Sequence, residues 1–208
     1  MSAVDRTVER MTDLDEKAML QGYLQRQRDA LLWKLEGLGE REARLPMTPT
    51  GTNLLGLVKH VAHMEYGYLG DVFGRPAADP LLIDLASADD NAEMWAKPSE
   101  SKGDIVAFYR RAQAHADATI GSLELSAVGT VPWWPQERRH PTLHRVLVHL
   151  VQELARHAGH ADIVRELVDG AAGMLPTASN LPDESAAEWA AYRARLQAIA
   201  DSFDDTAE

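Results

Sequence analysis

A short segment near residue 150 concentrates side chains that can bind a metal ion. Between His149 and His160 the chain carries histidines at positions 149, 157 and 160 and a glutamate at position 153. Residues four apart in a helix lie on the same face, so Glu153 and His157 can present an oxygen and a nitrogen to one point. Imidazole and carboxylate are common ligands of divalent metals, and this pair calls for a third ligand from elsewhere.

The apolar pattern of the same segment predicts which of these side chains face the interior. At 100° per residue, His157 falls about 20° from Val146 in the apolar stripe, and Glu153 about 20° on its other side. His160 and His149 lie further round, at about 40° and 60°. A buried carboxylate needs a cation, a hydrogen-bond donor or a proton. A metal ion would satisfy Glu153 and His157 together, and a simple ion pair remains the alternative.

A second group of polar residues lies in the helical pattern of residues 54–73. His60 falls beside apolar positions and is the better candidate for a side chain that faces the interior. His63 points nearly opposite the core, and we expect it in solvent. Glu65 lies near the centre of the apolar stripe, so we expect it to hydrogen-bond a ligand or a neighbouring helix.

Composition narrows the chemistry that these residues can perform. The chain has 208 residues and no cysteine, which excludes disulfides, thiolate metal sites and a cysteine nucleophile. Any thiol chemistry would need a thiol from outside the protein. The net charge of −11, without a basic stripe, argues against nucleic-acid binding. No run approaches the roughly 20 apolar residues of a membrane span, and the polar start lacks a signal-peptide core, so we expect a cytoplasmic protein without membrane contact.

Helical periodicity recurs along the chain, and no useful β-alternation interrupts it. This pattern predicts an all-α fold, a four-helix bundle with long crossover connections and an additional C-terminal helix. We expect a flexible lead over residues 1–12, a single bundle domain over 13–203 and a flexible tail over 204–208. The predicted helices cover residues 13–38, 54–73, 101–123, 141–168 and 183–203, and the last should turn Trp189, Tyr192, Leu196 and Ile199 inward.

Two further groups lie in the loop before the fourth long helix. Trp133 and Trp134 are flanked by prolines, cannot continue a helix, and must either pack on the domain or line a pocket. Arg138 and Arg139 could bind an anionic group of a substrate at the mouth of the bundle, or form an ordinary solvated charge pair.

His60 together with the spacing E-x3-H at Glu153 and His157 resembles the DinB-like superfamily of metal-binding four-helix bundles. Many members carry H-x3-H followed by R-G-Q, whereas here the first position is Glu153 and the trailing residues end in His160. The pattern is similar to the mycothiol-dependent maleylpyruvate isomerases, whose zinc ligands match His60, Glu153 and His157. The string ELARHAGHADIVRELVDGAAG, preceded by PWW, is similar to an actinobacterial branch that includes the mini-circle proteins. The resemblance covers residues 14–173.

The resemblance implies a divalent metal at His60, Glu153 and His157, with zinc favoured and nickel, iron and manganese compatible. It also implies a low-molecular-weight thiol such as mycothiol as cosubstrate and an electrophile as its partner. Two histidines and one carboxylate leave a coordination position open, as in catalytic zinc sites. A thiol that enters this position becomes a thiolate, ready for transfer or isomerisation. His160 and His149 could then orient a ligand or shuttle a proton, or could simply be partly exposed helix residues.

Two other classes of function fit the same residues. A metal-dependent hydrolase would use an activated water in place of the thiol. A noncatalytic bundle would use its polar seam only to bind a metal or to form an ion-pair network. A homodimer is compatible with either.

Overall fold

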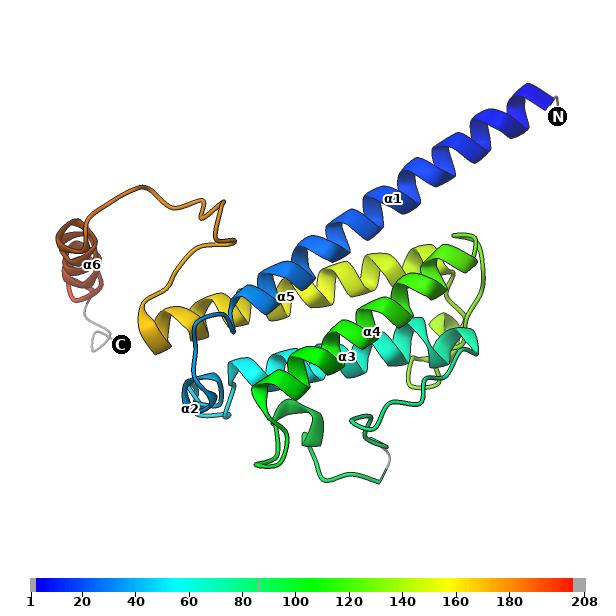
Figure 1. Cartoon of the computed structure of the whole chain (residues 1–208). Helices are drawn as coiled ribbons and strands as arrows, with labels where there is room; N and C mark the ends of the chain where they lie inside the picture. The colour runs from blue at the N-terminus through cyan, green and yellow to red at the C-terminus, as the bar shows by residue number, and fades with distance from the viewer. Residues whose placement is uncertain (1–2, 86, 204–208) are drawn as a thin grey trace.

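The computed structural model describes residues 3–85 and 87–203, with side chains from residue 16 onward, and within them it is all-helical (Figure 1). No β-strand occurs among these residues, which confirms the predicted fold class. None of their helices is both long and apolar enough to span a membrane. The elements in chain order are α1 (Ala3–Trp33), α2 (Glu40–Ala43), α3 (Leu54–Leu69), η1 (Asp71–Phe73), η2 (Ala92–Met94), α4 (Lys102–Ser122), η3 (Gln136–Arg138), α5 (Leu143–Asp169) and α6 (Ala186–Ala200).

The four long helices α1, α3, α4 and α5 form the bundle. α1 packs along α5 in the same direction, because Glu16 lies beside His144 near one end and Arg165 reaches the carbonyl of Lys34 near the other. α3 packs against both α4 and α5. It runs opposite to α5, with Tyr68 beside His149, so residues from two sequence regions about 90 positions apart face each other across the bundle.

α3 and α4 run in the same direction, with His63 against Phe108 and Gly70 near His115. The order is therefore up, down, down, up, and the chain must cross the length of the bundle between α3 and α4. This is the long crossover connection that the sequence predicts. It contains the short helical turn η2.

Local side-chain chemistry sets the helix boundaries. Asn53 accepts a hydrogen bond from the amide of Gly56, and Ser101 and Thr142 cap α4 and α5 in the same way. Gly170 ends α5 with φ 79°, a conformation that glycine adopts without strain. These boundaries lie within a few residues of the predicted ones.

The first helix differs from the prediction at both ends. It begins at Ala3 rather than near residue 13, so helix covers most of the segment expected to be a lead. The flexibility of residues 1–12 stays a prediction, and residues 1–2 and the tail 204–208 lie outside the described part. α1 ends at Trp33, because buried Arg165 donates hydrogen bonds to the carbonyls of Trp33, Lys34 and Glu36 beyond its last turn.

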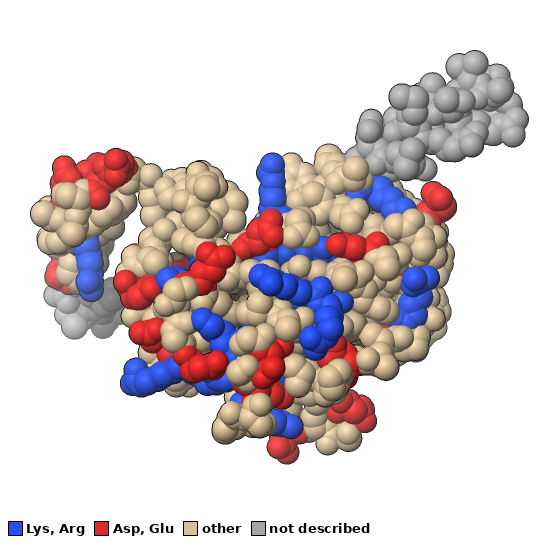
Figure 2. Space-filling model, viewed as in Figure 1, with Lys and Arg blue, Asp and Glu red and all other residues tan. Residues whose placement is uncertain are grey.

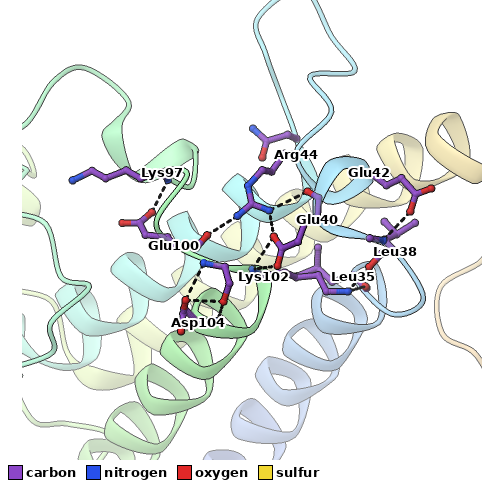
Figure 3. Close-up of polar contacts among 12 residues, drawn as sticks. Leu35, Leu38, Glu40, Glu42, Arg44, Lys97, Glu100, Lys102 and Asp104 are labelled. Atoms are coloured by element: carbon purple, nitrogen blue, oxygen red, sulfur yellow. Dashed lines mark hydrogen bonds and ion pairs between the residues drawn. The ribbon is translucent and has the colours of Figure 1, made fainter.

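A polar junction joins the end of α1 to the start of α4 (Figure 3). Glu40 of α2 accepts the backbone N–H of Lys102 at 2.9 Å, and the Lys102 ammonium donates to the carbonyls of Leu35 and Leu38. Arg44 bridges Glu40 and the carbonyl of Glu100. These contacts satisfy backbone groups that the helix ends leave unpaired.

The prediction that α6 packs inward is wrong. The helix lies beyond the end of α5 and carries no buried residue (Figures 1 and 2). The inward side chains of the four long helices already cover one another, so the α6 stripe finds no partner among the described residues. The exposed fractions of its apolar residues are 36% for Trp189, 45% for Tyr192, 46% for Leu196 and 52% for Ile199.

Candidate functional site

Two histidines from different helices meet inside the bundle. His60 of α3 and His157 of α5 contact each other edge-on, with ring centroids 4.9 Å apart. Their Nδ1 atoms are buried, and neither has a hydrogen-bond partner. A buried polar atom without a partner costs about 1–3 kcal/mol, so such a pair points to a missing ligand. The structure thus brings together the two histidines that the sequence selected.

Glu153 lies on the same cavity wall as His60, one helical turn before His157. Its side chain is half-buried and close enough to His60 to affect the pKa of that imidazole. Within the described residues, however, no group of three histidine, aspartate or glutamate side chains already converges on one point as a metal site requires. The two histidines fit a metal ion by their orphaned nitrogens, and Glu153 is the carboxylate that lies one helical turn before His157 on the face that the sequence predicts.

Both imidazoles are neutral near pH 7. Burial is the main cause that lowers the pKa of His157 to about 4, and the neighbouring His60, His160 and Arg156 contribute to the same shift. Burial also lowers the pKa of His60, although Glu93 and Glu153 oppose this shift. Metal ions bind the neutral form of imidazole, so protons would compete only weakly for these nitrogens at neutral pH.

A further carboxylate, Glu93, reaches the site from η2. Its Oε1 lies 3.6 Å from Nδ1 of His60, and only 18% of its side chain is exposed. Glu93 is not among the residues that the sequence pattern selects, because it lies outside the segments with helical periodicity. No periodic pattern places a loop residue over a helix, so the sequence alone held no signal for it.

Close packing on α3 holds the loop that carries Glu93. Asn53 donates to the carbonyl of Met94 at 3.2 Å, and a Cβ atom on Gly56 would lie 1.8 Å from that oxygen. Buried Lys59 donates to the carbonyl of Trp95 and pairs with Glu100 at 2.8 Å. Only glycine at position 56 allows this approach, and the result is a loop pinned beside His60.

The prediction that His63 is in solvent is wrong. Only 7% of the residue is exposed, and the connection between α3 and α4 covers it. Its Nε2 accepts the backbone N–H of Ile83 at 3.2 Å, so Nδ1 carries the proton and donates to the carbonyl of Lys59 at 2.9 Å. Both nitrogens are therefore occupied, and His63 is not available to a metal.

His60 lines a cavity of about 880 Å³ between α3, α5 and the crossover connection, and His157 contacts His60 from outside that lining. This volume suits a small organic molecule or two reactants together. Apolar and aromatic side chains line much of its wall, and polar groups enter at defined points. The lining includes His60, Met64, Tyr68, Glu93, Trp133, His149 and Glu153.

Tyr68 organises one end of this cavity. Its hydroxyl oxygen lies 3.1 Å from the indole nitrogens of Trp133 and Trp134 and 3.1 Å from Nε2 of His149. The two indoles can only donate, so the Tyr68 hydroxyl accepts both and donates its own proton to His149. Nε2 of His149 is then an acceptor, and this imidazole is neutral with its proton on Nδ1. The two tryptophans take the two predicted positions separately: Trp134 packs on the core, and Trp133 lines the cavity.

The other candidates from the sequence lie at different distances from this cavity. Glu65 is fully buried, accepts two hydrogen bonds from Arg28 of α1, and is not among the lining residues. His160 is exposed and contacts the His157 ring at 5.9 Å between centroids. Arg138 lines a second, smaller hollow, and Arg139 donates to the carbonyl of Trp134 at 3.4 Å.

Comparison with models of known families identifies the family of this chain, which the geometry of the site does not. The family model described as Mycothiol-S-transferase matches residues 19–170. This chain belongs to the mycothiol-S-transferase family. The match begins within α1, covers α3, α4 and α5, and ends at Gly170, the residue that terminates α5, so α6 lies outside it. Membership in the mycothiol-S-transferase family confirms the DinB-like resemblance. A comparison with curated proteins finds no significant match.

Proposed function

We propose that this member of the mycothiol-S-transferase family transfers a low-molecular-weight thiol to an electrophile, with a divalent metal held by His60, Glu153 and His157. The observation that carries the proposal is the contact between two half-buried imidazoles whose buried Nδ1 atoms have no hydrogen-bond partner. Zinc is the favoured ion, because two neutral histidines and one carboxylate are a common zinc ligand set that leaves a position open. A bound zinc ion would lower the pKa of an incoming thiol and so supply a thiolate near neutral pH.

Three other features of this chain fit a thiol-transfer reaction. The protein has no cysteine, so the thiol must come from a cosubstrate. The cavity beside His60 can hold both reactants, and its apolar wall restricts water that would compete with the thiol. Burial favours neutral imidazoles, which keeps the histidine nitrogens free of protons at the pH of the reaction.

Tyr68 and His149 are placed to handle a proton in this reaction. Their hydrogen bond positions Nε2 of His149 as an acceptor inside the cavity wall. When a thiolate adds to a conjugated carbonyl, the new enolate must gain a proton at carbon. We assign acceptance of the thiol proton to Nε2 of His149 by way of the Tyr68 hydroxyl, and the same two groups then return that proton to the α-carbon of the enolate.

The test is a thiol-transfer assay on the purified protein. Mycothiol and 1-chloro-2,4-dinitrobenzene are incubated with protein as purified, after chelation, and after addition of Zn²⁺. We expect conjugate formation that chelation abolishes and zinc restores, and a loss of at least about 100-fold in His157→Ala. His144→Ala is the matched control, because His144 lies on the same helix, pairs with Glu16 and does not line the cavity. Turnover of p-nitrophenyl esters without thiol transfer would overturn the proposal in favour of a hydrolase.

A further inference from the structure

A second hollow lies beside the main cavity. It has a volume of about 350 Å³ and sits where η3 approaches the first turns of α5. Trp134 and His149 contact each other edge-on at 5.0 Å between ring centroids, and His149 lines both spaces. The two hollows thus share one wall. The lining residues are Trp134, Arg138, Arg145, Val148, His149 and Gln152.

Two basic side chains give this hollow a positive charge. The protein carries 32 acidic and 21 basic residues, yet neither Arg138 nor Arg145 pairs with a carboxylate among the described residues. Two unneutralised guanidinium groups in one concavity favour an anion, and guanidinium matches the planar carboxylate with two parallel hydrogen bonds.

Neighbouring side chains give the hollow a defined shape. The guanidinium carbon of Arg145 lies 5.8 Å from the centroid of the Trp134 ring, a cation–π contact that limits its orientations. The Trp134 ring is in turn held by its hydrogen bond to Tyr68. Gln152 adds an amide that can donate to a second oxygen. Cation, aromatic surface and amide donor together form a subsite for an organic acid rather than for a bare ion.

We propose that this hollow binds a carboxylate group carried by one of the two reactants, while the reactive end of that molecule lies in the main cavity. The inference rests on the proposed thiol transfer and adds the substrate class. In the reaction, the thiolate sulfur forms a bond to the β-carbon of a conjugated carbonyl, the carbon–carbon π bond breaks, and the α-carbon gains a proton. The carboxylate is unchanged and serves only as a handle.

The first experiment measures binding without chemistry. Isothermal titration calorimetry compares monomethyl fumarate, which carries a carboxylate, with dimethyl fumarate, which is neutral. We expect the double variant Arg138→Gln/Arg145→Gln to bind the anionic ester at least about tenfold more weakly and the neutral ester unchanged. Arg110→Gln is the matched control, since this exposed arginine of α4 lines neither hollow. His157→Ala should keep the binding of monomethyl fumarate, so a failed metal site does not hide a working carboxylate subsite.

The second experiment identifies which reactant carries the carboxylate. Rates of addition are compared for the two fumarate esters with N-acetylcysteine amide, and for N-acetylcysteine and its amide with dimethyl fumarate. If the double variant lowers the rate with the anionic ester but not with the neutral ester, the electrophile carries the carboxylate. If it lowers the rate with N-acetylcysteine but not with its amide, the thiol carries the carboxylate. Equal effects on charged and neutral members in binding and in both rate comparisons would overturn the subsite.

Discussion

The imidazoles of His60 and His157 lie edge-on, 4.9 Å apart between centroids, and each has a buried Nδ1 atom without a partner. One histidine comes from α3 and the other from α5, which run in opposite directions. Packing of these helices therefore creates a contact that neither sequence segment contains alone. Native proteins seldom leave two adjacent buried nitrogens without hydrogen bonds, and this observation supports the proposed metal ion between them.

The depressed pKa of His157 predicts how stability depends on pH in the metal-free protein. With a pKa of about 4 in the folded state against 6.5 for the ordinary imidazole, the unfolded chain binds a proton that the folded chain resists. The free energy of unfolding should therefore be fully present above pH 6.5 and should fall as the pH drops towards 4. Urea unfolding of chelated protein at several pH values measures this fall.

The variant His157→Gln isolates the contribution of this residue. Its free energy of unfolding should decline less steeply between pH 6.5 and 4 than that of the wild type. His140→Gln is the control, because His140 is exposed in the loop before α5. Identical slopes for His157→Gln and the wild type would contradict the burial of this imidazole.

The buried ion pair between Arg28 and Glu65 predicts strong coupling between α1 and α3. Arg28 donates to both carboxylate oxygens, at 3.0 and 2.6 Å, and both side chains are inaccessible. Glu65→Leu should cost about 3–5 kcal/mol of unfolding free energy, because it leaves a buried guanidinium with Asp117 as its one acidic partner among the described residues. The double variant Arg28→Met/Glu65→Leu should recover most of that loss. Equal losses in the single and double variants would show that the two side chains do not act as a pair.

The hydroxyl of Tyr68 should hold the aromatic end of the cavity. Tyr68→Phe removes the acceptor of two indole N–H groups and the donor to His149. We expect a loss of about 1–3 kcal/mol in unfolding free energy and an altered tryptophan emission spectrum. Tyr23→Phe, an exposed tyrosine on α1, serves as the control. An unchanged emission spectrum in Tyr68→Phe would argue against this hydrogen-bond cluster.

Removal of α6 should leave the bundle intact. A chain that ends at Leu181 keeps Leu175, which packs against the core, and loses a helix without buried residues. We expect the free energy of unfolding to change by less than about 0.5 kcal/mol. A loss of several kcal/mol would show that α6 packs against the domain, as its sequence pattern suggests.

Much of the bundle follows from local rules that a single sequence contains. Periodicity locates the long helices, and the caps at Asn53 and Ser101 fix where two of them begin. The end of α1 could not be predicted in the same way. It depends on Arg165, which reaches the last carbonyls of α1 from another helix. Likewise, the pattern of α6 shows an apolar stripe but not whether any surface is left to receive it.

The candidate site likewise combines features that helical periodicity predicts with features that it does not predict. The angular positions of His60, Glu153 and His157 predict that they face one interior, and the structure places His60 beside His157. Burial of His63 depends on the crossover connection, which lays Ile83 over a helix face that would otherwise meet solvent. The approach of Glu93 depends on the same connection. Helical periodicity describes one helix at a time and carries no information about the loop that covers it.

The central claim is that His60, Glu153 and His157 hold one divalent metal ion. Elemental analysis of the untagged protein after dialysis tests it most directly, with the wild type beside His60→Ala, Glu153→Ala and His157→Ala, and with His144→Ala as control. We predict about one metal ion per chain in the wild type and in His144→Ala, and a loss of most of it in each of the other three variants. Stoichiometric metal retained in all three, or a wild type that holds no metal even after incubation with Zn²⁺, would contradict the account.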